Sequence, residues 1–105
     1  MIDSIHYDVI ISEKATQMLI SHAVFLANVN EEAANRLIIA FEECAESLKF
    51  MPQRNPFFDA EYIPKNKYHK HIFEKRYLIL YQIKDTKVYI DYVLDCRQNY
   101  QWLII

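Results

Sequence analysis

The chain of 105 residues contains no glycine. Glycine takes positive backbone φ angles at little cost, and it lets a backbone approach a bound phosphate closely. Phosphate-binding loops and dinucleotide-binding turns both depend on it, so this sequence can form neither. Kinases, nucleoside triphosphatases and Rossmann-fold enzymes are therefore excluded. Turns must be built from Asn, Asp and Pro, which tolerate the required backbone angles for their own reasons.

The apolar pattern of the first half predicts a strand followed by two helices. Residues 7–11, YDVII, form a short β-rich run. Ser12 then stands at an N-cap position, and apolar residues recur at spacings of three and four as far as Val29. Asn30 resembles the cap of a second helix, whose apolar stripe continues to Leu48. Since almost no loop separates the helices, we expect an antiparallel hairpin.

The second half changes to a pattern typical of strands. Residues 50–64 contain all three prolines and no apolar period, which predicts a loop. The tight Asp85–Thr86 turn predicts an antiparallel hairpin between the last two strands. The order β-α-α-β-β-β predicts a single α+β domain over residues 1–105, with the helix hairpin packed on a small, mainly antiparallel sheet. The three strands expected after the loop are 68–75, 77–84 and 88–95.

Composition predicts a reduced, cytoplasmic protein. An apolar content of 52% with 25% charged residues is ordinary for a soluble globular chain. The longest uncharged apolar run is much shorter than a membrane span, and the N-terminus lacks the order of a signal peptide. Cys44 and Cys96 alone cannot make a disulfide framework or a four-ligand metal site. We expect no contact with a membrane.

Charge is divided unevenly along the chain. Residues 1–48 hold eight acids and two bases, a net of −6, whereas residues 49–105 hold ten bases and six acids, a net of +4. The densest basic segment is PKNKYHKHIFEKR, residues 64–76. Such asymmetry favours an anionic partner for the second half. The same lysines could instead serve only to keep a sheet surface soluble.

Two histidines are candidates for acid–base chemistry. His69 and His71 are two residues apart on a predicted strand, so both project from one face. Neutral imidazole is the usual general acid or base near pH 7. The pair could also bind a metal, but the sequence offers no evident third ligand. We therefore expect no bound metal. An exposed, polar strand face without chemistry is the plainer interpretation.

Arg97 is the strongest single candidate for a functional residue, because it follows the last predicted strand and its planar guanidinium group suits bidentate binding of a phosphate. Alternatively, it could lock the strand end through a salt bridge to Asp95 or Asp91. Tyr100 could stack on a base or donate its hydroxyl, or it could simply pack. With the histidines, these groups suit RNA cleavage by the 2′-hydroxyl. That reaction needs a base, an acid and a cation, but no metal or cofactor.

The element order resembles that of the RelE/ParE superfamily of bacterial type II toxins, as does the segment over residues 69–103. The resemblance is closest in YLILYQI, then in VYIDYVLD, then at Arg97 after the last strand. It implies a small toxin neutralised by an antitoxin protein encoded beside it. Members of one branch cut messenger RNA in the ribosomal A site. Members of another branch poison DNA gyrase without being nucleases.

The resemblance also implies roles for residues of this chain. Arg97 matches the arginine that follows the last strand in the RNA-cutting branch, and Tyr100 is a looser match to its terminal aromatic residue. His71 and Arg76 lie near its basic positions on the middle strands. The departures are the net acidic charge and Asn99, which stands where some relatives carry histidine.

Three functional hypotheses follow. The first is a ribosome-dependent endoribonuclease of messenger RNA. In it, Arg97 stabilises the scissile phosphate, His71 or His69 transfers protons and Tyr100 orients a base, so that the partners are antitoxin, ribosome and messenger RNA. The second is a non-enzymatic inhibitor of DNA gyrase, and the third is a degenerate toxin that only binds its antitoxin. The residues expected to bind the RNA backbone in the first hypothesis are Lys65, Lys67, Lys70, Lys75 and Arg76.

Overall fold

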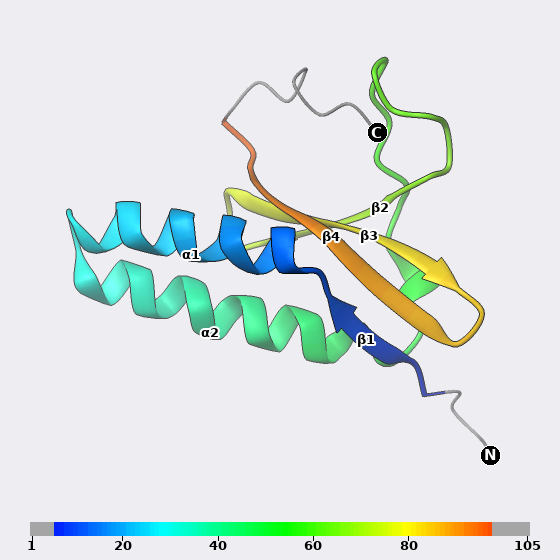
Figure 1. The fold of residues 1–105 in the computed structure, drawn as a ribbon, viewed down its shortest axis with the longest axis horizontal. Coiled ribbons are helices and arrows are strands. Elements are labelled where there is room, and N and C mark those ends of the chain that lie inside the picture. The colour runs from blue at the N-terminus through cyan, green and yellow to red at the C-terminus, as the bar shows by residue number, and fades with distance from the viewer. Residues whose placement is uncertain (1–5, 98–105) are drawn as a thin grey trace.

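The computed structural model describes residues 6–97 and shows a helix hairpin packed on one face of a four-stranded sheet (Figure 1). None of the helices within this range is long and apolar enough to cross a membrane. The expected order β-α-α-β-β-β is confirmed. The elements are β1 (Asp8–Ile11), α1 (Glu13–Ala27), α2 (Glu31–Ser47), a 3₁₀ turn (Pro52–Arg54), β2 (His69–Phe73), β3 (Tyr77–Lys84) and β4 (Lys87–Asp95).

Both predicted helix caps are present. The Ser12 Oγ accepts a hydrogen bond of 2.9 Å from the Ala15 amide, and the Asn30 Oδ1 accepts one of 3.2 Å from the Ala33 amide. Because α1 ends at Ala27 and Asn30 already caps α2, the chain reverses within three residues. This short connection makes the two helices antiparallel neighbours, as the sequence predicted.

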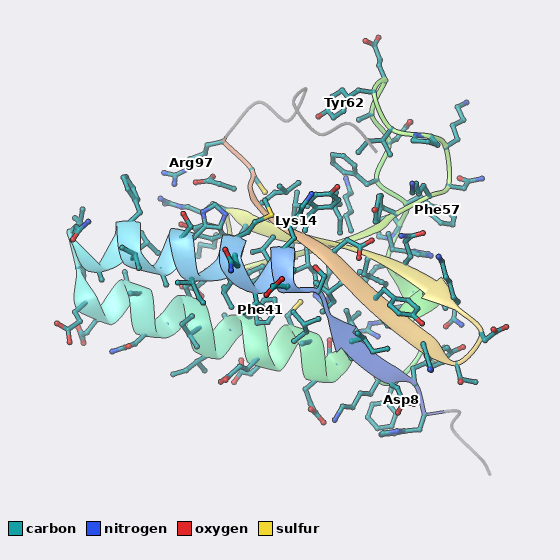
Figure 2. All side chains as sticks on the ribbon, in the orientation of Figure 1. Asp8, Lys14, Phe41, Phe57, Tyr62 and Arg97 are labelled. Carbon is teal, nitrogen blue, oxygen red and sulfur yellow. The ribbon has the colours of Figure 1, made fainter. Side chains whose placement is uncertain are left out.

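The sheet has the order β1-β4-β3-β2. The β3–β4 and β2–β3 pairs are antiparallel, whereas β1 runs parallel to β4. Alternation along the strands gives the sheet two apolar faces. One face packs under the helices around Phe41, Ile79 and Val93. The other carries Leu80 and Leu94 and is covered by the loop that follows α2, on which Figure 2 labels Phe57 and Tyr62.

Helix α1 covers the part of β4 that β1 is too short to pair. The Ser12 amide donates to the Ile90 carbonyl at 3.0 Å, and the Ser12 Oγ donates to the Asp91 carbonyl at 3.4 Å. Further along, the His22 Nε2 lies 3.0 Å from the Val93 carbonyl, which can only accept. The N-cap residue of α1 and one side chain within the helix thus contact carbonyls of β4 beyond the reach of β1.

Turns in this glycine-free chain use other residues at positive φ. Asn66 and Asp85 take φ values of 59° and 57°, as expected for Asn and Asp. Met51, Glu74 and Lys75 also lie at positive φ, at 46°, 50° and 70°. The expectation that Asn, Asp and Pro would provide the turns was therefore incomplete. The antiparallel pairing of β2 with β3 requires a tight turn at Glu74 and Lys75, which places these residues in a region that residues of their type rarely occupy.

Substitution of Ser12 by alanine should lower the free energy of unfolding by about 1–2 kcal/mol, because it removes a cap and a strand contact together. Urea denaturation followed by circular dichroism measures this change. Ser21→Ala, at an exposed position of the same helix, is the matched control and should change the value by less than about 0.5 kcal/mol. Equal effects of the two substitutions would contradict the role given to Ser12.

Candidate functional site

Arg97 is held by the last residue of β4. Its backbone amide and its Nε both donate to the Asp95 Oδ1, at 2.9 and 3.0 Å, and its Nη2 donates to the Asp95 Oδ2 at 2.7 Å. These bonds lower the pKa of the Asp95 carboxyl, although burial opposes the shift. The Asp95 side chain is 10% exposed and that of Arg97 is 55% exposed. Of the two carboxylates considered from sequence, Asp95 is the partner.

Asp91 has a different role on the other side of the sheet. Its Oδ2 accepts hydrogen bonds from the Tyr68 hydroxyl at 2.9 Å and from the Gln82 amide at 2.8 Å. Burial and this carboxylate raise the pKa of the Tyr68 hydroxyl, in that order of importance. Asp91 therefore organises polar side chains from β3 and from the residue that precedes β2, and neither of these two hydrogen bonds involves Arg97.

Three predicted basic residues gather at one end of the sheet. Lys75 and Arg76 form the turn between β2 and β3, and the Arg76 carbonyl accepts a hydrogen bond of 2.7 Å from the Cys96 amide. Tyr77 of β3 pairs with Asp95 of β4 at this same end of the sheet. Arg97 follows directly and lies beside the far part of α1 (Figure 2). The structure thus brings Lys75, Arg76 and Arg97 together.

His69 lies away from this end and is only 9% exposed. Its Nδ1 donates to the Asn55 carbonyl at 2.7 Å, and its ring stacks on Tyr81 with centroids 5.3 Å apart. Phe57, whose ring centroid is 4.2 Å from that of His69, covers the other side. The expectation of an exposed strand face is wrong for His69, because the chain around residues 55–57 folds over it.

His71 shares the face of His69, as predicted, but it also contacts the loop. Its Nδ1 is 3.3 Å from the Asn55 Nδ2, which can only donate, and the same amide donates to the Tyr81 hydroxyl at 2.9 Å. Burial is the larger cause of a lowered pKa of the His71 imidazole, and the charge of Arg54 adds to it. His71 is therefore held neutral within a structural network.

The geometry separates the histidines from Arg97. His71 pairs with Ile79, and Ile79 pairs with Val93, so His71 lies two strands, or about 10 Å, across the sheet from β4. Asp95, which holds Arg97, lies two residues or about 7 Å further along. General acid–base catalysis needs contact near 3 Å or through one water. The proposed proton-transfer groups and the proposed phosphate ligand are not assembled here.

The remaining predicted residues are scattered. Lys70 alternates to the sheet face opposite His69 and His71, where its charge acts on Cys96. Lys67 lies 5.7 Å from the centre of the Tyr68 ring, and Lys65 is exposed on the preceding loop. Tyr100 lies outside the described residues. We predicted a basic face shared by the histidines and these lysines, and the structure does not form it.

Neither cysteine has the surroundings of a nucleophile. Cys44 is buried, and burial raises the pKa of its thiol to about 12. Burial and Asp95 raise the pKa of the Cys96 thiol, in that order. Within residues 6–97, no three His, Cys, Asp or Glu side chains are placed to hold a metal ion.

Sequence reasoning missed two residues that organise this region. Asn55 connects His69, His71 and Tyr81, although it lies in a loop that carries no periodic signal. Tyr77 lies among Asp95, Arg97 and Arg76 and was treated only as part of a strand. The one sequence signal that could have indicated this role of Tyr77 was its place at the start of β3, beside the predicted turn.

A comparison with protein families identifies the class of protein to which this chain belongs. A family model described as the ParE toxin of type II toxin–antitoxin system, parDE, matches residues 9–100. The chain therefore belongs to the ParE toxin family, and its partner is an antitoxin.

A solved structure titled "Chromosomal ParDE TA system from P. aeruginosa" has the same fold. The TM-score is 0.72 at 14% sequence identity, and the match covers 88% of this chain and 98% of that chain. No match was found among curated proteins. At this low identity the likeness concerns the fold, and it agrees with the helix hairpin and mixed sheet described above.

Acidification should destabilise the fold through His71. Its lowered pKa in the folded state means that the stabilisation is present above the unfolded value of about 6.5 and is lost as pH falls toward the folded value. Urea denaturation at pH 7.5 and 5.5 should show a smaller loss for His71→Gln than for the wild type. An NMR titration in which the native His71 ring titrates above pH 7 would contradict this explanation.

Arg97→Gln should release Asp95 and raise the pKa of its carboxyl. The loss of unfolding free energy at pH 7 should be small, since solvent screens the exposed Arg97 side chain. NMR titration of the Asp95 carboxyl checks the first effect and urea denaturation the second. Lys87→Gln, at the opposite end of β4, is the control. An unchanged Asp95 pKa would mean that the pair does not form in solution.

Proposed function

We propose that this toxin acts by binding DNA gyrase and inhibiting it without cutting nucleic acid. The observation that carries the proposal is the commitment of Arg97 to Asp95, with the two histidines held elsewhere by Asn55. The residues that a nuclease would use thus make internal contacts instead. Membership of the ParE family supports the same choice, since the gyrase-poisoning branch of the superfamily works without nuclease chemistry.

An inhibitor of this kind needs a surface that a protein partner can bury. The helix hairpin carries exposed apolar side chains at Ile20, Val24 and Ile39, which are 52%, 57% and 54% exposed. Ile20 and Val24 are four residues apart and so lie on one face of α1. Burial of one such side chain contributes roughly 1.5–3 kcal/mol. These three residues, the apolar helix surface, are the contacts we propose for gyrase.

The test is inhibition of gyrase supercoiling by the purified toxin. Wild-type toxin should inhibit, and Val24→Asp should raise the half-inhibitory concentration by about tenfold or more, because it places a charge in the buried contact. Ile72→Asp is the matched control, since Ile72 is equally exposed but lies on β2. Equal potency of both variants would exclude the apolar helix surface. No inhibition by folded wild-type toxin would reject the gyrase proposal.

The ribosome-dependent endoribonuclease is the second candidate, favoured by the gathering of Lys75, Arg76 and Arg97 at one end of the sheet. A labelled messenger RNA in a reconstituted translation reaction tests it. Ribosome-dependent cuts that disappear with Arg97→Ala would establish it and overturn the first proposal. Absence of both cuts and supercoiling inhibition would leave a toxin that only binds its antitoxin.

A further inference from the structure

Strand β1 forms one edge of the sheet (Figure 1). The amides of Asp8 and Ser12 donate, both at 3.0 Å, to carbonyls of β4 and of the turn before it. Because the backbone groups of successive residues point to opposite sides of a strand, those of Val9 and Ile11 point away from β4. Within residues 6–97, the amides of Val9 and Ile11 donate to no group outside the sheet. The outer side of β1 is therefore available for pairing.

The opposite edge of the sheet, β2, is covered along its first part. The Lys70 amide donates to the Pro56 carbonyl at 2.9 Å, and the Phe58 amide donates to the Tyr68 carbonyl at 2.7 Å. The loop after α2 thus runs beside β2. In the described part of the chain, β1 has no such cover after Asp8, and it lacks the proline or lysine that commonly prevents an edge from pairing. A further strand can therefore be added at β1.

Apolar side chains surround this edge. Ile10 and Ile11 are each 39% exposed, although isoleucine is among the residues most often buried. A groove of about 320 Å³ lies between β1 and α2. Its apolar lining consists of Val9, Ile11, Phe41 and Ala45. A strand added here gains backbone hydrogen bonds and apolar contact together.

The charged residues of the groove all come from α2 and the turn that ends it. They are Glu42, Glu46 and Lys49. Glu42 and Lys49 are seven residues apart, which corresponds to about 10 Å along a helix. The Lys49 Nζ lies 3.0 Å from the Glu46 Oε1, but the Glu46 side chain is 66% exposed, so this pair is weak and easily exchanged. The groove therefore has an acid at one end and a base at the other.

A twofold axis makes this surface complementary to itself. In a symmetric dimer the same patch of both chains forms the interface, so each end of the groove meets the other end on the second chain. Antiparallel pairing about an axis at Ile10 places Val9 opposite Ile11 of the second copy, and the two residues then exchange both backbone hydrogen bonds. The same axis turns Glu42 of one chain toward Lys49 of the other. Two ion pairs thus accompany the strand pairing.

We propose that β1 is the interface of a homodimer of this toxin, in which the β1 strands of two copies pair antiparallel and join both sheets into one. An unrelated strand can satisfy the backbone groups equally well. The opposite charges at the two ends of the groove, however, match a second copy of this chain. The inference stands whether or not the toxin inhibits gyrase, because this interface shares no residue with the apolar helix surface.

The test is sedimentation equilibrium of the full chain, purified without antitoxin, from about 10 μM to about 1 mM. The fraction of dimer should rise with concentration. Hydrogen exchange of the Val9 and Ile11 amides should slow as the dimer forms, whereas exchange of the Ile10 amide, which faces β4, should change little. A chain that stays monomeric, or a dimer that leaves the Val9 and Ile11 amides unprotected, would overturn the proposal. Protection of these amides only after antitoxin is added would assign the edge to the antitoxin and would also overturn it.

Exchange of charges identifies the second copy as the occupant. Lys49→Glu and Glu42→Lys each turn two attractions into two repulsions, so each should raise the dissociation constant of the dimer by about tenfold. An equimolar mixture of the two variants restores both attractions and should associate as tightly as the wild type. Glu43→Lys, at an exposed position outside the groove, is the matched control and should leave association unchanged. If the mixture associates as weakly as each variant alone while circular dichroism shows native folds, the two grooves do not face each other and the proposal is wrong.

Discussion

The unpaired edge of β4 is the constraint on which the rest of the structure depends. This strand has nine residues, whereas its neighbour β1 has four, so the carbonyls beyond β1 need other partners. Helix α1 supplies them through Ser12 and His22. The helix is thereby fixed along the strand, and α2 follows it because the connection is so short. The position of the hairpin then determines what surrounds the end of the sheet.

That end is where the basic residues of the middle of the chain meet the end of β4. Asp95 neutralises Arg97 there, whereas Lys75 and Arg76 keep their charges beside a cavity walled by Tyr77. The histidines belong to a separate network around Asn55, which joins the loop after α2 to β2 and β3. The described part of the protein thus has two separate polar regions. One region joins the loop after α2 to the sheet, and the other gathers positive charge where the β2–β3 turn meets the end of β4.

Sequence patterns predicted the elements of the fold because their signals are local. Ser12 and Asn30 cap helices by bonds within three residues, and the Asp85–Thr86 turn joins strands that are adjacent in sequence. The parallel pairing of β1 with β4 makes the sheet mixed, in keeping with the expectation of a mainly antiparallel sheet.

The candidate site could be predicted only in part, because it depends on contacts between distant segments. Alternation correctly placed His69 and His71 on one face, but nothing in the sequence indicated that Asn55 would cover them. The sequence left both Asp91 and Asp95 as possible partners of Arg97. Only the structure at the end of the strand shows that the partner is Asp95. Lys70 illustrates the same limit. It lies between the two histidines in the sequence, and alternation along the strand therefore places it on the opposite face of the sheet.

The chain belongs to the ParE toxin family, and the candidate residues Arg97, His69 and His71 make internal contacts. The central proposal is that this toxin acts by binding gyrase. Direct binding of purified toxin to purified gyrase, measured by calorimetry in the absence of nucleic acid, tests this claim most directly. We predict a saturable complex that persists with Arg97→Gln and is weakened about tenfold or more by Val24→Asp. Absence of any complex with gyrase, together with binding to ribosomes that requires Arg97, would contradict it.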